Sequence, residues 1–73
     1  MNRKENMILA DNLLDLRFIH RLSQKDLAEK AGVSRTVISK IENGFSDSVT
    51  LETLRKLSSA LNTELFLFFK PKV

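Results

Sequence analysis

Positive charge is concentrated in one third of the chain, at a density that suits the binding of an anionic partner. Between positions 17 and 40, six basic residues stand against two acidic ones, which leaves this segment with a charge of about +4. The whole chain of 73 residues has a formal net charge of +3, so the remainder is close to neutral. We therefore expect an anionic partner to prefer this segment. Its basic residues are Arg17, Arg21, Lys25, Lys30, Arg35 and Lys40.

Catalytic and metal-binding chemistry has no comparable support in the sequence. His20 is the only histidine, and the chain has no cysteine, no paired carboxylates, no glycine-rich phosphate loop and no metal-ligand spacing. We therefore expect no enzyme activity, no cofactor and no metal. The absence of cysteine fits a reducing cytoplasm, and the lack of a signal peptide or membrane-length apolar segment predicts a soluble protein without a membrane partner.

Four amphipathic helices are predicted to position the basic side chains. Ser23, Ser34 and Thr50 are typical first residues of helices, because a side-chain oxygen there can accept a hydrogen bond from a free backbone amide. Gly32 is typical of a left-handed helix stop. Helices are expected over about 5–20, 24–31, 35–43 and 51–62. The apolar residues expected in the core of the middle pair are Leu27, Ala28, Ala31, Val33, Ile38 and Ile41.

A short turn that contains Gly32 joins the second and third predicted helices. Such a turn sets the second helix steeply across the first, which makes this pair a helix-turn-helix. Capped amphipathic helices with short loops also occur in any helical bundle, and the polar residues between 35 and 43 could form a solvated helix surface. Periodicity and charge alone leave both interpretations open.

The order of residues in two stretches resembles a known family. LSQKDLAEKAGVSRTVISKIENG, residues 22–44, followed by SVTLETLRKLSSAL, residues 48–61, is similar to the Cro and phage-repressor type of helix-turn-helix protein, the xenobiotic-response-element family. The resemblance covers roughly residues 9–61. It implies a mainly all-α fold, a compact four-helix domain of the lambda-repressor type. It also implies sequence-specific binding of double-stranded DNA in transcription regulation, as a repressor.

The resemblance implies roles for individual residues. Family members place the start of the third helix in the major groove, which implies base reading by Arg35, Thr36, Val37 and Lys40. It implies phosphate contacts for Ser23, Gln24, Ser34, Ser39, Asn43 and Ser46.

Three other residues have roles that the sequence leaves open. Phe45 stands where a basic or polar residue is more common in the family, so it could touch DNA or cover the core. In a subset of the family an ion pair ties the first helix to the third, which implies a structural pair of Arg17 and Glu42. The alternative is that these are two exposed charges.

The C-terminal residues 63–73 depart from the family pattern, in which a fifth helix often follows. Five consecutive apolar residues before Pro71 predict a short buried β-strand, and a lone strand leaves its backbone groups unpaired. We expect this strand to pair with its twin across a two-fold axis; a short helix that dimerises through the same phenylalanines is the alternative. The residues expected to dimerise are Leu65, Phe66, Leu67, Phe68, Phe69 and, on the first helix, Leu14 and Phe18.

The expected organisation is an N-terminal arm over 1–6, disordered without DNA, a helix-turn-helix domain over 7–62 and a dimerisation strand over 63–73. The small size favours a homodimer, which would bind a pseudo-palindromic operator. A compact domain with a terminal strand resembles the antitoxin branch of the family, which would add a toxin as a second protein partner. Phage repressors and restriction-modification controllers share the same core. A protein-binding adaptor is the further alternative, disfavoured because no acidic residue occurs between Val33 and Ile41.

Overall fold

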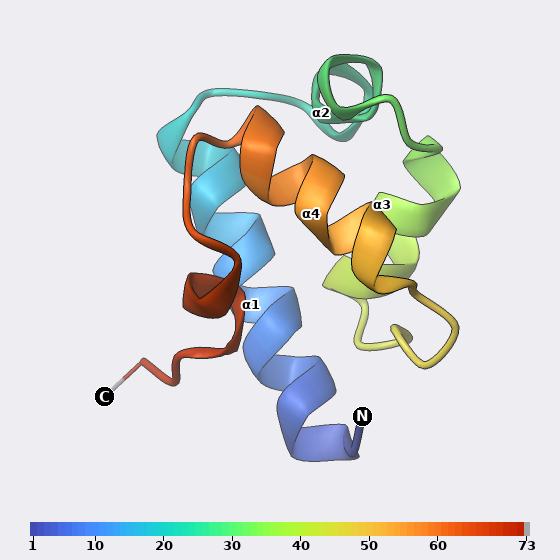
Figure 1. Ribbon diagram of the computed structural model, residues 1–73, viewed down its shortest axis with the longest axis vertical. Helices are drawn as coiled ribbons and strands as arrows, with labels where there is room; N and C mark the ends of the chain where they lie inside the picture. Colours follow the sequence, from blue (N-terminus) through green and yellow to red (C-terminus); the bar gives the residue numbers. More distant parts are fainter. Residues whose placement is uncertain (73) are drawn as a thin grey trace.

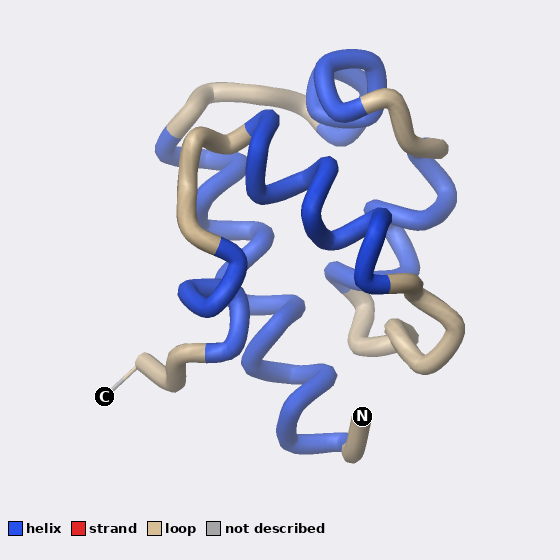
Figure 2. Tube along the Cα trace, in the orientation of Figure 1, coloured by secondary structure: helices blue, strands red, loops and turns tan. Residues whose placement is uncertain are grey.

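Residues 1–72, the part of the chain that this computed structural model describes, contain four α-helices and one short 3₁₀ helix. α1 packs against α3 and against the 3₁₀ helix η1, while α4 packs against α2 and η1 (Figure 1). Loops join these elements, and no strand occurs in residues 1–72 (Figure 2). The elements are α1 (Arg3–Ile19), α2 (Gln24–Ala31), α3 (Arg35–Glu42), α4 (Leu51–Ala60) and η1 (Leu65–Phe69).

Capping side chains explain where the helices α2, α3 and α4 begin. The hydroxyls of Ser23, Ser34 and Thr50 each accept a hydrogen bond from the backbone amide three residues later. Gly32 ends α2 with a left-handed φ of 71°, a conformation that costs glycine little because it has no Cβ. The predicted bounds of α2 are confirmed, and those of α3 differ by one residue because Asn43 is its C-cap.

α1 begins before the position that apolar periodicity indicated. Asn2 accepts a hydrogen bond from the backbone N of Glu5 at 2.8 Å, and Glu5 Oε1 accepts one from the backbone N of Asn2 at 2.9 Å. This reciprocal capping box satisfies two free amides and starts the helix at Arg3. The expectation of a separate arm over 1–6 is therefore wrong for residues 3–6, which belong to α1.

One hydrophobic core lies between the helices and takes side chains from every element. α1 contributes Leu9 and Leu13, and η1 contributes Phe68, all fully buried. Four of the six predicted middle-pair core residues are buried, whereas Ala31 and Val33 pack at the edge of the core. The compact four-helix fold expected from the sequence is confirmed.

The C-terminal segment forms η1, so the predicted β-strand is wrong. Side chains three residues apart share a face in a 3₁₀ helix, so Leu65 and Phe68 face the core while Phe66 and Phe69 face outward. The side chain of Asn12 donates to the carbonyls of Phe68 at 2.8 Å and of Lys70 at 2.9 Å. A side chain of α1 thus supplies donors to this backbone that a partner strand would otherwise supply. Val73, at the end of the predicted strand, lies outside the described residues.

None of the helices in residues 1–72 is long and apolar enough to span a bilayer.

Candidate nucleic-acid interface

The outer face of α3 carries the residues expected to read bases. Arg35, Thr36 and Lys40 are exposed, whereas the opposite face of the helix is fully buried through Ile38 and Ile41. The first two turns of α3 contain no acidic residue. This face can donate from the guanidinium fork of Arg35 and the ammonium of Lys40, which suits base edges or phosphates.

Val37 differs from the other expected base-reading residues. Its side chain is half-buried and packs against the core, so only part of it remains for contact with a ligand. Its backbone amide donates to Ser34 Oγ at 3.1 Å and so forms the cap of α3.

Two helix N-termini lie at the start of α2 and of α3. Ser23 and Ser34 are exposed, and their hydroxyls accept hydrogen bonds from the backbone amides of Asp26 and Val37. A helix N-terminus also presents the positive end of the peptide dipoles. Both ends can therefore hold a phosphate, as expected for Ser23 and Ser34. The backbone N of Ser23 donates to Asp26 Oδ2 at 3.1 Å, and this bond, followed by one from the Ser23 hydroxyl, lowers the pKa of Asp26 below its ordinary value.

Behind this surface an ion pair joins α1 to α3, and a hydrogen bond to the same carboxylate adds α2. Arg17 donates from Nε to Glu42 Oε2 at 2.8 Å and from Nη2 to Glu42 Oε1 at 2.9 Å. The two side chains are 11% and 6% exposed, so the pair is nearly buried. The hydrogen bonds to Glu42 raise the pKa of Arg17 above its ordinary value. Gln24, the first residue of α2, donates from Nε2 to the same Glu42 Oε1 at 3.0 Å, which fixes its amide while leaving a second N–H for a phosphate.

The end of α3 places the last three predicted phosphate residues differently. Asn43 donates to the carbonyl of Ser39 at 2.7 Å, so the two residues cap the helix end together. Ser46 is only 1% exposed, and its hydroxyl donates to Asn6 Oδ1 at 2.7 Å. The hydroxyl of Ser46 joins α1 to the loop after α3, so in this structure it is not presented to a phosphate.

Two asparagines that the sequence analysis did not single out organise this part of the molecule. Asn6 accepts from Ser46 and donates to Asp47 Oδ1 at 3.0 Å, and Asn12 holds the C-terminal segment. A signal for both exists in the sequence, because each lies three residues from Leu9 and so on the buried face of the first helix.

Exposed apolar side chains occur at the ends of α1 and η1 and after α3. Phe18 and Phe66, two of the residues expected to dimerise, are each 64% exposed, and Leu14 and Leu67 are half-buried. Phe68 is fully buried in the core of its own chain, so it is not available for a partner subunit. Phe45 is 69% exposed, which answers the open question about this residue: it does not cover the core.

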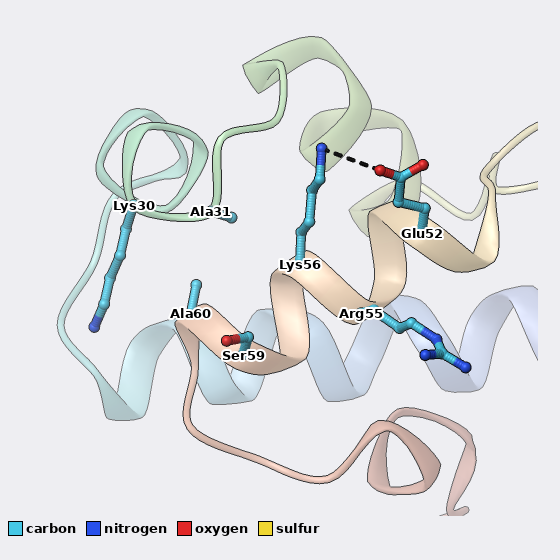
Figure 3. Close-up of a pocket in the computed structure, with 7 residues that line it drawn as sticks. All are labelled: Lys30, Ala31, Glu52, Arg55, Lys56, Ser59 and Ala60. Carbon is cyan, nitrogen blue, oxygen red and sulfur yellow. Dashed lines mark ion pairs between the residues drawn. The ribbon is translucent and has the colours of Figure 1, made fainter.

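A recess between the end of α2 and α4 has no convergent polar groups. Its volume is about 490 Å³, and it is lined by three basic residues. Figure 3 shows that Lys30 and Arg55 point in different directions, while Lys56 pairs with Glu52 at 3.6 Å. This arrangement does not focus charge on one ligand atom. No cluster of three potential metal ligands occurs in residues 1–72.

The short turn between α2 and α3, with the exposed basic face of α3, defines a helix-turn-helix protein. A helix-turn-helix family model matches residues 20–68, so the chain belongs to this family of DNA-binding regulators of the Cro and phage-repressor type. The resemblance seen in the sequence is thereby confirmed.

Individual relatives are regulators as well. The control protein C.SmaI of Serratia marcescens is 47% identical over 58 residues, 80% of this chain and 68% of that protein. HigA2 of Mycobacterium tuberculosis, described as a candidate antitoxin, is 38% identical over 63 residues, 86% of this chain and 62% of that protein. The crystal structure of NHTF, a hypothetical transcription factor from Neisseria, matches 97% of this chain and 82% of its own with a TM-score of 0.85 and 25% identity.

Proposed function

We propose that this protein is a sequence-specific transcriptional repressor that binds a pseudo-palindromic operator as a homodimer. The observation that carries the proposal is the outer face of α3, which is basic and exposed at Arg35 and Lys40 and is fixed to the core on its other side. A helix of this kind fits the major groove, where each base pair presents a distinct set of donors and acceptors.

Arg35 would bind a guanine through O6 and N7, and Thr36 and the exposed part of Val37 would meet a thymine methyl group. Lys40 would reach a base edge or a phosphate. The N-termini of α2 and α3, through Ser23 and Ser34, would hold phosphates on either side of the groove and so set the position of α3. The amide of Gln24, held by Glu42, would add a phosphate contact.

The homodimer is supported by the apolar surface near the ends of α1 and η1. Phe18, Ile19 and Phe66 are among the most exposed apolar side chains of the molecule, and large exposed apolar surface marks protein interfaces. A groove of about 300 Å³ between α1 and the C-terminal segment is lined by Ile19 together with Leu16 and Leu67. To bind a pseudo-palindromic operator, a two-fold dimer through this face needs its two α3 helices about one helical turn of DNA, roughly 34 Å, apart.

A role as an autoregulating antitoxin is the second candidate. It is supported by the 38% identity to HigA2, over 62% of that protein. A toxin would then be the additional partner. The similarity to the control protein C.SmaI supports the alternative of a control protein.

Electrophoretic mobility shift with the DNA upstream of its own gene tests the proposal. The gel is run at two salt concentrations against an excess of random competitor. A shift that resists the competitor and weakens with salt is expected, because phosphate contacts release counterions. No specific shift at micromolar protein would contradict the proposal and favour the adaptor, in which the same fold binds a protein.

A further inference from the structure

Positive charge that the proposed function does not use surrounds the recess of about 490 Å³ between the end of α2 and α4. Two sequence-distant helices contribute to this surface, here named the α2–α4 recess. The residues that carry its chemistry are Lys30 and Ala31 of α2 and Glu52, Arg55, Lys56 and Ala60 of α4. We propose that the α2–α4 recess binds an acidic segment of another protein, with apolar side chains of that segment on the floor and its carboxylates at the three cations.

The α2–α4 recess lies apart from the surface proposed to bind DNA. Lys30 is in the last turn of α2, at the opposite end of that helix from Ser23 and Gln24. α4 packs against α2 and η1, and none of the residues expected to contact bases or phosphates lines the recess. The DNA contact therefore does not account for these cations, and the inference stands independently of the proposed function.

Helix stability does not account for all three cations either. Lys30 in the last turn of α2 interacts favourably with the helix dipole, but the last turn of α4 contains no basic residue, since Arg55 and Lys56 precede it. Within residues 1–72, neither Lys30 nor Arg55 forms an ion pair. Lys56 pairs with Glu52 at 3.6 Å, and these side chains are 48% and 79% exposed. Solvent screens such a pair, so a carboxylate of a partner can replace Glu52 at little cost.

The spacing of the cations suits a row of carboxylates better than a single anion. Figure 3 shows Lys30 on the α2 side and Arg55 farther along α4, pointing in different directions, with Ala60 between them in this view. Cations arranged in this way do not converge on one phosphate. An extended acidic segment, by contrast, presents carboxylates at several points along the recess, and complementary charge of this kind selects partners at protein interfaces.

The floor of the recess is apolar, which favours a protein segment over the evenly charged backbone of a nucleic acid. Ala31 is half-buried and Ala60 is 8% exposed, and because both side chains are small, the space between the two helices stays open. The aliphatic stems of Lys30 and Lys56 can add apolar surface while their ammonium groups stay in water. An acidic segment that also carries apolar side chains fits both parts of this surface.

Fluorescence anisotropy with the full chain and a labelled peptide of four Asp-Glu-Leu repeats tests the inference. A peptide of four Asn-Gln-Leu repeats is the neutral control. The acidic peptide is expected to bind, and the neutral one to bind about tenfold more weakly, because it has no charge to meet the cations. Salt should weaken binding of the acidic peptide, since exposed charges are screened.

Lys30→Glu combined with Arg55→Glu is expected to weaken binding of the acidic peptide about tenfold, since two attractions become repulsions. Lys4→Glu combined with Lys25→Glu is the matched control, because these exposed lysines do not line the recess and the net charge changes equally. The control pair should change the affinity less than about twofold. Lys30→Arg, which keeps the charge, should bind as the wild type does. All these positions are exposed, and circular dichroism checks that each variant is folded.

Backbone amide spectra of the wild type locate the bound peptide without any substitution. The signals of Ala31 and Ala60 are expected to shift when the acidic peptide is added, whereas that of Arg35 on α3 should stay in place. The same shifts should occur when the upstream duplex is already bound, because the recess lies apart from the outer face of α3.

Several results would overturn the inference. No binding of the acidic peptide, or equal losses in the two double variants, would mean that the recess offers no site beyond the net charge of the chain. A shift at Arg35 without shifts at Ala31 and Ala60 would place the peptide on the DNA-binding face. Shifts of Ala31 and Ala60 with random duplex would assign the recess to nucleic acid. Wild type that binds the peptide at the recess but neither duplex would support this inference and contradict the proposed function.

Discussion

Arg35 is the side chain on which base reading depends most in the proposed function. Replacing it by alanine should cost about 1–3 kcal/mol on the operator and relax the preference at one base pair, because its bidentate bonds to guanine are lost. Binding to the operator and to its single-base variants measures both effects. Equal losses on operator and random DNA would show that Arg35 touches only phosphates.

Gln24→Ala is the contrasting variant, and we expect it to weaken all DNA sequences similarly. Its side chain would bind a phosphate, which carries no sequence information. Since the amide also donates to Glu42, the variant's stability must be measured beside its affinity. A change in base preference would contradict the phosphate role.

The pair of Arg17 and Glu42 has a structural task, and it can be separated from DNA binding. Glu42→Ala should reduce the free energy of unfolding by about 3 kcal/mol, because a nearly buried guanidinium would lose its partner. Urea denaturation measures this loss. The double variant Arg17→Met with Glu42→Leu should recover most of it, since apolar side chains need no partner there. A double variant as unstable as the single one would count against this explanation.

Ser46 shows why single residues are harder to assign from sequence than helices are. A serine just after a helix is a reasonable phosphate ligand when only its neighbours are considered. Its actual partner, Asn6, is 40 residues away in the chain, and only the packing of α1 on α3 brings them together. The ion-pair geometry of Arg17 and Glu42, by contrast, follows from a spacing that the family resemblance already implied.

Among the elements, α2 and α3 were the most predictable, because their start and stop signals are local. Ser23, Gly32 and Ser34 act on backbone groups within four residues of themselves. The run LFLFF carries no such signal, and its apolar residues suit a strand or a short helix equally well. Asn12, on the distant helix α1, donates to the backbone carbonyls of Phe68 and Lys70, and this contact favours the helix over the strand.

The cap of α2 predicts a pH dependence of stability. The pKa of Asp26 is lowered in the folded state from its ordinary value of 3.8, so the folded protein prefers the charged carboxylate. This stabilisation is complete above that value and is lost as the pH falls through the folded-state pKa. The difference in stability between wild type and Asp26→Asn should thus be constant above about pH 5 and shrink below 3.8. Thermal melts across this range measure it, and a constant difference at all pH values would contradict the prediction.

The attachment of η1 to α1 should depend on Asn12. Asn12→Leu leaves the carbonyls of Phe68 and Lys70 without these donors, at a cost of about 1–3 kcal/mol. Urea denaturation measures the loss, and amide hydrogen exchange in residues 65–70 should become faster. Unchanged stability and exchange would mean that the apolar contacts of Phe68 hold the segment unaided.

For the whole molecule, the proposed dimer makes a direct prediction. Phe18→Glu or Phe66→Glu should convert dimers into monomers at micromolar concentration, because a charge would be buried in the apolar contact. Sedimentation measures the mass of the assembly. Operator affinity should fall in the monomeric variants, because two subunits that are no longer linked bind their half-sites independently. Leu51→Glu is the surface control. A wild type that stays monomeric at all concentrations would contradict the dimer.

The two faces of η1 have a consequence for how such a regulator responds to its own abundance. In the proposed dimer, Phe68 anchors the helix inward while Phe66 and Phe69 from the same short turn meet the partner subunit. Dilution below the dissociation constant would uncover the outer pair and remove the stability that subunit binding adds to the folded state. At low concentration the protein would therefore be both monomeric and more easily degraded. Its abundance, its lifetime and the occupancy of its operator would then rise and fall together.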